Sequence, residues 1–154
     1  FEEQQKLLIQ IDLTLRNMHE SVTQMRSVQS QLKYYVTAFE EKKSYDELMK
    51  KAKEIEEKLV AWEGNLIQSN QKTFQDVINF NNKLNAELMY LKGFVDSEHP
   101  KVTQGSIDRF NDLKTQWDNH NKELSVIIET EFSSFESLFE SMKVPALLIP
   151  ETGF

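Results

Sequence analysis

The chain has 154 residues, of which 39% are hydrophobic and 28% are charged, and its formal net charge is −7. One domain fits this length, and the low content of glycine (4) and proline (3) favours a helical protein over a β-sandwich or a disordered tail. The negative charge gives no electrostatic reason to bind nucleic acid, and the lack of cysteine excludes disulfides, thiolate nucleophiles and cysteine-based zinc sites.

A long first helix is predicted over about residues 2–41. Apolar residues recur there at alternating spacings of three and four, so they share one face that can pack against partner helices. At 1.5 Å per residue such a helix would be about 60 Å long, which is too long for a compact globule. The predicted seam consists of Leu8, Ile11, Leu15, Met18, Val22, Met25, Gln29, Leu32, Val36 and Phe39.

A second helix is predicted over about residues 45–62, with the same alternating spacing. Ser44 and Glu47 have the separation of a reciprocal capping box, in which each side chain bonds the other residue's backbone amide. Gly64 then interrupts the pattern, while Leu66 indicates that the following connection still lies against the bundle. The predicted seam consists of Tyr45, Leu48, Ala52, Ile55, Leu59 and Trp62.

A third helix is predicted over about residues 74–97. Thr73 and Asp76 have the spacing of a helix-start signature, and Pro100 would end the helix. Asn81 lies on the seam, where it could mark a kink, an ordinary polar position or a ligand site, because asparagine side chains compete for backbone hydrogen bonds. The predicted seam consists of Phe74, Val77, Asn81, Leu84, Leu88, Leu91 and Val95.

A fourth helix is predicted over about residues 104–142, followed by an extended tail over 144–154 that should pack down on the bundle. Two successive steps of four, from Leu124 to Ile128 and on to Phe132, predict a local change in helix winding. The predicted seam consists of Phe110, Leu113, Trp117, His120, Leu124, Ile128, Phe132, Phe135, Phe139 and Met142.

Together these segments predict an all-α fold, an elongated antiparallel up-down bundle with coiled-coil-like packing that forms a single domain over residues 1–154. Two arrangements remain open. Either the second and third helices stack end to end, which gives a three-helix rod, or they form a short hairpin within a four-helix bundle. Because the helical pattern is already present in the first residues, we also expect the domain to be a piece of a longer chain.

No catalytic, cofactor-binding or metal site is predicted. Asp96 and His99 have an acid-x-x-His spacing, but di-metal bundles need two such motifs and two further inward carboxylates, whereas the inward positions here are apolar. His120 lies on the seam, where a hydrogen-bonded histidine in the core or at its edge is the expected role. The aromatic residues have helical spacing and are expected in the core. The apolar run at 144–150 is far shorter than the ~20 residues of a membrane span.

Several stretches together carry a family pattern. They are Trp62, "KTFQDVINF" (72–80), "NKLNAEL" (82–88), Leu91, "VTQG" (102–105), "RFNDL" (109–113), Trp117, Phe135 and "VPALLIP" (144–150). Through them, the chain from Trp62 to Pro150 resembles the C-terminal helical region of large bacterial proteins that begin with a β-propeller of sialidase-type (BNR/Asp-box) or sortilin-type repeats. Such proteins are commonly labelled glycosyl hydrolases or sortilin-like proteins. The single residues of the pattern are Trp62, Thr73, Phe74, Asp76, Asn81, Leu84, Arg109, Trp117, Phe135, Pro145 and Pro150.

The resemblance implies a non-catalytic accessory domain of an exported, extracytoplasmic protein, in the periplasm, at the surface or secreted. Its partners would be the upstream propeller of the same chain, a second copy or a docked protein, without nucleic acid and without membrane insertion. No cofactor is implied. A proline often stands in the family where this chain has Asn81, which favours a kink there. The alternative is a stand-alone, spectrin-like coiled-coil rod that scaffolds other proteins.

Apolar residues beside the seams predict an association surface. In the first helix these are Leu7, Val28 and Tyr35, and in the fourth helix Phe132 and Phe139 flank Phe135 and Leu138. Apolar surface of this breadth usually marks an interface unless another element covers it. We expect either a two-fold dimer or contact with the propeller.

Overall fold

The structure is a computed structural model that describes residues 2–68, 83–97 and 102–149. Most of these residues are helical and none of them forms a strand, so the predicted all-α class is confirmed. The elements in chain order are α1 (Glu2–Ala38), a 3₁₀ turn η1 (Lys43–Tyr45), α2 (Asp46–Gly64), α3 (Leu84–Ser97), α4 (Gln104–Ile127), a π-helical segment η3 (Ile128–Phe132) and α5 (Ser133–Ser141).

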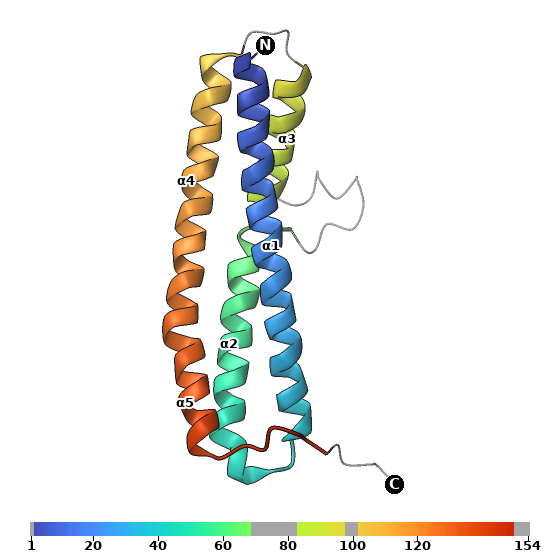
Figure 1. Cartoon of the computed structure of the whole chain (residues 1–154), viewed down its shortest axis with the longest axis vertical. Helices are drawn as coiled ribbons and strands as arrows, with labels where there is room; N and C mark the ends of the chain where they lie inside the picture. Colours follow the sequence, from blue (N-terminus) through green and yellow to red (C-terminus); the bar gives the residue numbers. More distant parts are fainter. Residues whose placement is uncertain (1, 69–82, 98–101, 150–154) are drawn as a thin grey trace.

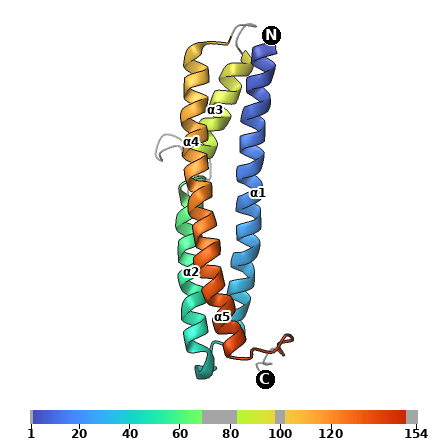
Figure 2. The ribbon, with the colours of Figure 1, turned by 60° about the vertical axis from the view of Figure 1, so that its left-hand side comes forward.

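These elements form a rod with three legs (Figure 1). The first leg is α1, and the last leg is α4, η3 and α5, which follow one another without a break and run in the same direction as α1. The middle leg runs in the opposite direction and consists of α2 and α3, both of which pack against α1 and α4. A second view shows the same order along the rod (Figure 2). Of the two arrangements left open by the sequence, the three-helix rod is the one observed.

A backbone hydrogen bond joins the two helices of the middle leg. The amide of Asn85, in the first turn of α3, donates to the carbonyl of Leu66, just after α2, over 2.9 Å. Leu66 is fully buried, as the sequence predicted for this connection. This bond joins the end of α2 to the start of α3 within the middle leg.

Most predicted seam positions as far as Leu124 form the core, whereas Leu8, Gln29 and Val36 of α1 and every seam position after Leu124 are partly buried or exposed. Two side-chain hydrogen bonds to backbone carbonyls fix the legs against one another: Gln4 Nε2 donates to the carbonyl of Val95 over 2.9 Å, and Trp62 Nε1 donates to that of His120 over 2.7 Å. The largest fully buried side chains are Ile11, Met18, Leu48, Ile55, Leu59, Leu66, Leu88, Leu113 and Val95. All but Leu66 lie at predicted seam positions.

The start of α2 differs from the prediction. Ser44 does not cap the helix. It lies in the 3₁₀ turn η1, which continues directly into α2, and the residue before α2, Tyr45, makes no side-chain capping bond. The first helix also ends at Ala38, before residue 41. The reason is packing: the tight turn brings the Tyr45 ring against Phe39 in a tilted arrangement, with ring centroids 4.5 Å apart, and backbone hydrogen bonds satisfy the turn.

The predicted fourth helix, residues 104–142, is not one continuous α-helix. A π-helical segment at Ile128–Phe132 divides it, at the place where the two steps of four predicted altered winding. A π-turn holds one more residue than an α-turn, so the inward positions after this segment are shifted by one residue, whereas before it the regular three-four spacing continues from Leu124 to Ile127. Ile128 is exposed, and Ile127 packs against the core in its place.

The described part of the tail, residues 144–149, packs on the α5 end of the rod through Val144 and Leu148, whereas Leu147 and Ile149 are exposed. Lys143 has a positive φ of 53°, which turns the chain away from the helix axis. Val144 and Leu148 then contact a small second core made of Phe39, Leu48 and Met49. This contact closes the bottom of the rod in Figure 1.

Part of the predicted third helix lies outside the described residues. Its expected start at Thr73 and Asp76, the seam residue Phe74 and the kink at Asn81 all belong to this part, and so does Pro150 in the tail. Within the described residues α3 begins at Leu84.

Truncation of a buried seam leucine should destabilise the rod far more than truncation of its neighbour on the outer face. Leu15 is 8% exposed and Leu13 is 52% exposed on the same helix. We expect Leu15→Ala to lower the free energy of unfolding by about 2–5 kcal/mol, as should Leu84→Ala and Leu113→Ala. Leu13→Ala should change it by no more than about 0.5 kcal/mol. Urea unfolding measures both, and equal losses at Leu13 and Leu15 would contradict the assigned seam.

Candidate functional site: an apolar groove between α1 and α5

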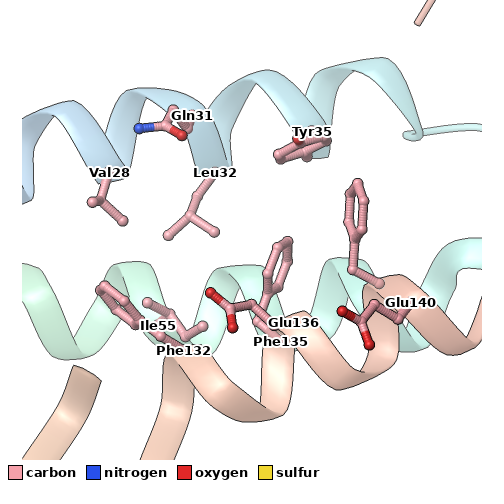
Figure 3. A pocket seen from close by; sticks show the side chains of 10 residues that line it. Val28, Gln31, Leu32, Tyr35, Ile55, Phe132, Phe135, Glu136 and Glu140 are labelled. Atoms are coloured by element: carbon pink, nitrogen blue, oxygen red, sulfur yellow. The ribbon is translucent and has the colours of Figure 1, made fainter. Parts of the chain in front are cut away.

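An open, mainly apolar groove of about 380 Å³ lies between α1 and the η3–α5 segment, near one end of the rod (Figure 3). Its size is within the range of known binding pockets. It is lined by Val28, Gln31, Leu32, Tyr35, Ile55, Phe132, Phe135, Glu136, Phe139 and Glu140.

Helical periodicity builds both walls of the groove. On α1 the apolar side chains Val28, Leu32 and Tyr35 recur at spacings of four and three, so they face the same direction. On the opposite wall, phenylalanines stand at residues 132, 135 and 139, with spacings of three and four. Ile55, which is almost fully buried, comes from α2 and forms the floor. Each wall therefore presents about two turns of apolar surface.

The groove is open because α5 packs on α2. At η3 the inward position is occupied by Glu131, whose carboxylate pairs with the ammonium groups of two α2 residues, Lys51 and Lys58, the latter over 2.6 Å. These contacts bind the last leg to α2 at this level. None of the described residues after Leu124 in this leg is buried, which leaves the side facing α1 accessible.

An aromatic cluster closes the end of the groove nearest to the tail. The ring of Tyr35 lies 5.5 Å from Phe139, 6.1 Å from Phe135 and 6.3 Å from Phe39, measured between centroids. Aromatic pairs at such distances prefer tilted or edge-to-face geometry, and most of these contacts have it. The cluster fixes the orientation of Tyr35 and so gives the groove a rigid end.

The rim of the groove is acidic. Glu136 and Glu140 stand one turn apart on α5, and neither forms an ion pair with a described residue. No lysine, arginine or histidine lines the groove. Elsewhere between α1 and α2 an acidic side chain does have a partner, since Arg26 of α1 pairs with Glu63 of α2 over 2.7 Å. In the groove, by contrast, the carboxylates of Glu136 and Glu140 have no paired cation among the described residues.

Of the residues in the family pattern, one lies in the groove, namely Phe135. Trp62, Trp117 and Leu84 are buried in the core. Arg109 of α4 pairs with Glu87 of α3 over 3.1 Å and so joins two legs. Pro145 is exposed in the tail. These described pattern residues thus hold the rod together and do not converge on a common site.

The histidines do not gather either. His120 is partly exposed, and its buried Nδ1 has no hydrogen-bond partner, although Glu123 Oε2 lies 3.5 Å away, so the expected hydrogen-bonded core histidine is not found. His19 Nε2 lies 2.5 Å from Asn85 Oδ1. His99 belongs to the part that is not described. In the described ranges no group of three or more acidic or histidine side chains could hold a metal ion.

The sequence anticipated the groove in part. Val28, Tyr35, Phe132 and Phe139 were expected to flank the seams, and all four line the groove. Leu7, which belonged to the same prediction, is instead buried in the core, because α1 turns it inward and leaves Leu8 only partly buried. The expectation that the aromatic residues are core is wrong for several of them. Tyr34, Tyr90 and Phe94 are exposed.

Comparison with known proteins gives no relative: no protein-family model, no curated protein and no solved structure matches this chain. No described helix has the length and apolar character needed to cross a membrane. The function is therefore argued from the groove itself.

The Glu131 carboxylate should make the stability of the rod depend on pH. Its hydrogen bonds from Lys51 and Lys58 lower the pKa of Glu131 below the ordinary value of 4.5. The ionised form thus stabilises the fold above about pH 4.5, and this contribution is lost as the pH falls through the lowered pKa. Glu131→Gln should reduce the free energy of unfolding at pH 7 by about 1 kcal/mol, with a smaller difference in acid.

Glu129→Gln is the matched control, because Glu129 lies in the same turn, is exposed and pairs with no described residue. Thermal unfolding of the three proteins across a pH series measures the effect. A difference between Glu131→Gln and the native chain that does not shrink in acid would show that the two lysines do not hold this carboxylate ionised.

Proposed function

We propose that this chain is a non-catalytic accessory helical domain whose groove between α1 and α5 is a docking surface for another polypeptide. The observation that supports it is the groove itself, with apolar walls that are two helical turns long, a rigid aromatic end and an open side. Apolar surface that is concentrated in one open concavity usually marks an interaction site.

The shape favours a helix as the docked element. An amphipathic helix binds in such a groove through anchors at positions i, i+3 or i+4, and i+7. The walls have the same repeat, at residues 28, 32 and 35 of α1 and at 132, 135 and 139 opposite. A small-molecule site usually adds several converging polar groups to its apolar lining. Here the polar lining residues are Gln31, Glu136 and Glu140.

The family resemblance supplies the setting of this proposal. In that setting the domain belongs to an exported, extracytoplasmic bacterial protein with a sialidase-type or sortilin-type propeller, labelled as a glycosyl hydrolase. The groove would serve packing on the propeller, dimerisation or docking of another protein. The alternative is a stand-alone coiled-coil rod. Asp-box or sortilin-type repeats encoded upstream of Phe1 would support the first setting, and further helical heptads there would support the second.

A library of displayed helical peptides, varied at all outer positions, tests the docking function. Peptides selected on the native chain should no longer bind the Phe132→Ser variant, because this change removes one of the three phenylalanines that form one wall of the groove. The matched control is Phe94→Ser, which alters an exposed phenylalanine of α3 that is 49% exposed and lies outside the groove. Binding to Phe94→Ser should equal binding to the native chain.

A second variant controls for loss of binding through misfolding of Phe132→Ser. Gln31→Trp fills the groove from an exposed position and removes no packed side chain. It should also abolish binding while circular dichroism and the unfolding midpoint stay native-like. Selected peptides that bind all these variants equally well would show that the groove is not a docking surface.

A further inference from the structure

We propose that the docked element is a basic amphipathic helix, with lysine or arginine residues one turn apart beside its apolar stripe. This inference rests on the proposed docking function and adds the chemistry of the partner. It follows from the charges at the rim, from their spacing and from the poor fit of the other occupants.

The charges of the groove have one sign. Its charged lining residues are Glu136 and Glu140, and they meet no cation among the described residues. Across the groove α1 presents the uncharged residues Val28, Gln31 and Tyr35. The chain as a whole carries a net charge of −7, so its field also attracts a basic partner. Charge complementarity at a rim selects the partner and speeds its association.

The spacing of the two carboxylates sets the pattern of the partner. Residues four apart on a helix lie about 6 Å from each other on the same face. Two basic residues at i and i+3 or i+4 on the docked helix have the same separation and can meet Glu136 and Glu140 together. The phenylalanines of the same wall point into the groove beside them, so cations and apolar anchors would lie on adjacent faces of the docked helix (Figure 3).

A second copy of this chain fits less well. In a two-fold dimer each groove faces its own counterpart, so the carboxylates of Glu136 and Glu140 would stand opposite those of the other copy. The whole of α5, Ser133–Ser141, contains no basic residue that could pair with them. Like charges opposed across an interface oppose association.

The tail of the chain is not the occupant in the described structure. Val144 and Leu148 contact the second core at Phe39, Leu48 and Met49. The stretch 144–149 also has no basic residue. Within the described residues no segment of the chain therefore occupies the groove beside the acidic rim.

Three synthetic helical peptides with one common apolar stripe test this inference. They carry two lysines, two glutamines or two glutamates one turn apart beside the stripe, and fluorescence anisotropy measures their affinity for the native chain. The lysine peptide should bind about tenfold more tightly than the glutamate peptide. Added salt should reduce this ratio, because the Debye length falls from about 10 Å at 0.1 M to about 3 Å at 1 M.

The combined change Glu136→Gln and Glu140→Gln should weaken the lysine peptide by about three- to tenfold and leave the glutamine peptide unchanged. The control, Glu2→Gln with Glu3→Gln, makes the same change in net charge on exposed residues at the start of α1. It should leave all three affinities unchanged. An equal loss with both double variants would overturn the inference, because the preference would then come from total charge.

The remaining outcomes distinguish a failure of the basic-partner inference from a failure of the proposed docking function. Equal affinities for the three peptides, all lost in Phe132→Ser, would overturn the basic partner and retain the groove as a docking surface. Binding that is indifferent to Phe132→Ser and Gln31→Trp would overturn both. Light scattering tests whether a second copy of the chain occupies the groove. A dimer that excludes the lysine peptide and dissociates in Gln31→Trp would overturn the basic helix as occupant.

Discussion

The extra residue in the π-helical turn Ile128–Phe132 is the constraint on which the α5 end of the rod depends. In a continuous α-helix the three-four spacing that begins at Phe110 would continue through Ile127 and Glu131 to Ser134 and Leu138. The added residue moves the inward positions after Glu131 to Phe135 and Phe139, which line the groove toward α1. Glu131 itself pairs with two lysines of α2. Such insertions are frequent at functional sites.

The rest of the rod is uniform by comparison. Each leg buries one stripe of side chains, and hydrogen bonds from Gln4 and Trp62 to carbonyls of other legs fix the relative positions of the helices. The two helices of the middle leg are joined by a backbone hydrogen bond between Asn85 and Leu66. The three legs together hold the two walls of the groove side by side. A preformed groove costs less ordering on binding than one that must first assemble.

In the groove, different residues provide contact area and partner specificity. The aromatic and aliphatic walls offer contact area without regard to the identity of the partner, whereas Glu136 and Glu140 distinguish partners by charge. Other charged residues between the legs form ion pairs, among them Arg26 with Glu63 and Arg109 with Glu87. In a rod that otherwise presents mixed charge, the carboxylates beside an apolar groove are the part of the surface suited to a specific contact.

The sequence by itself determined the helices and most of their buried faces, because helical periodicity is a local property and every leg of a rod buries one stripe. It also located the altered winding near Ile128 and named four of the groove residues. Only the tertiary structure decided that α2 and α3 stack end to end, that Leu7 is core whereas Val28 is not, and that Glu131 faces lysines. The physical reason is that the burial of a flanking residue depends on the distance to the next leg. That distance is set by the packing of all three legs together.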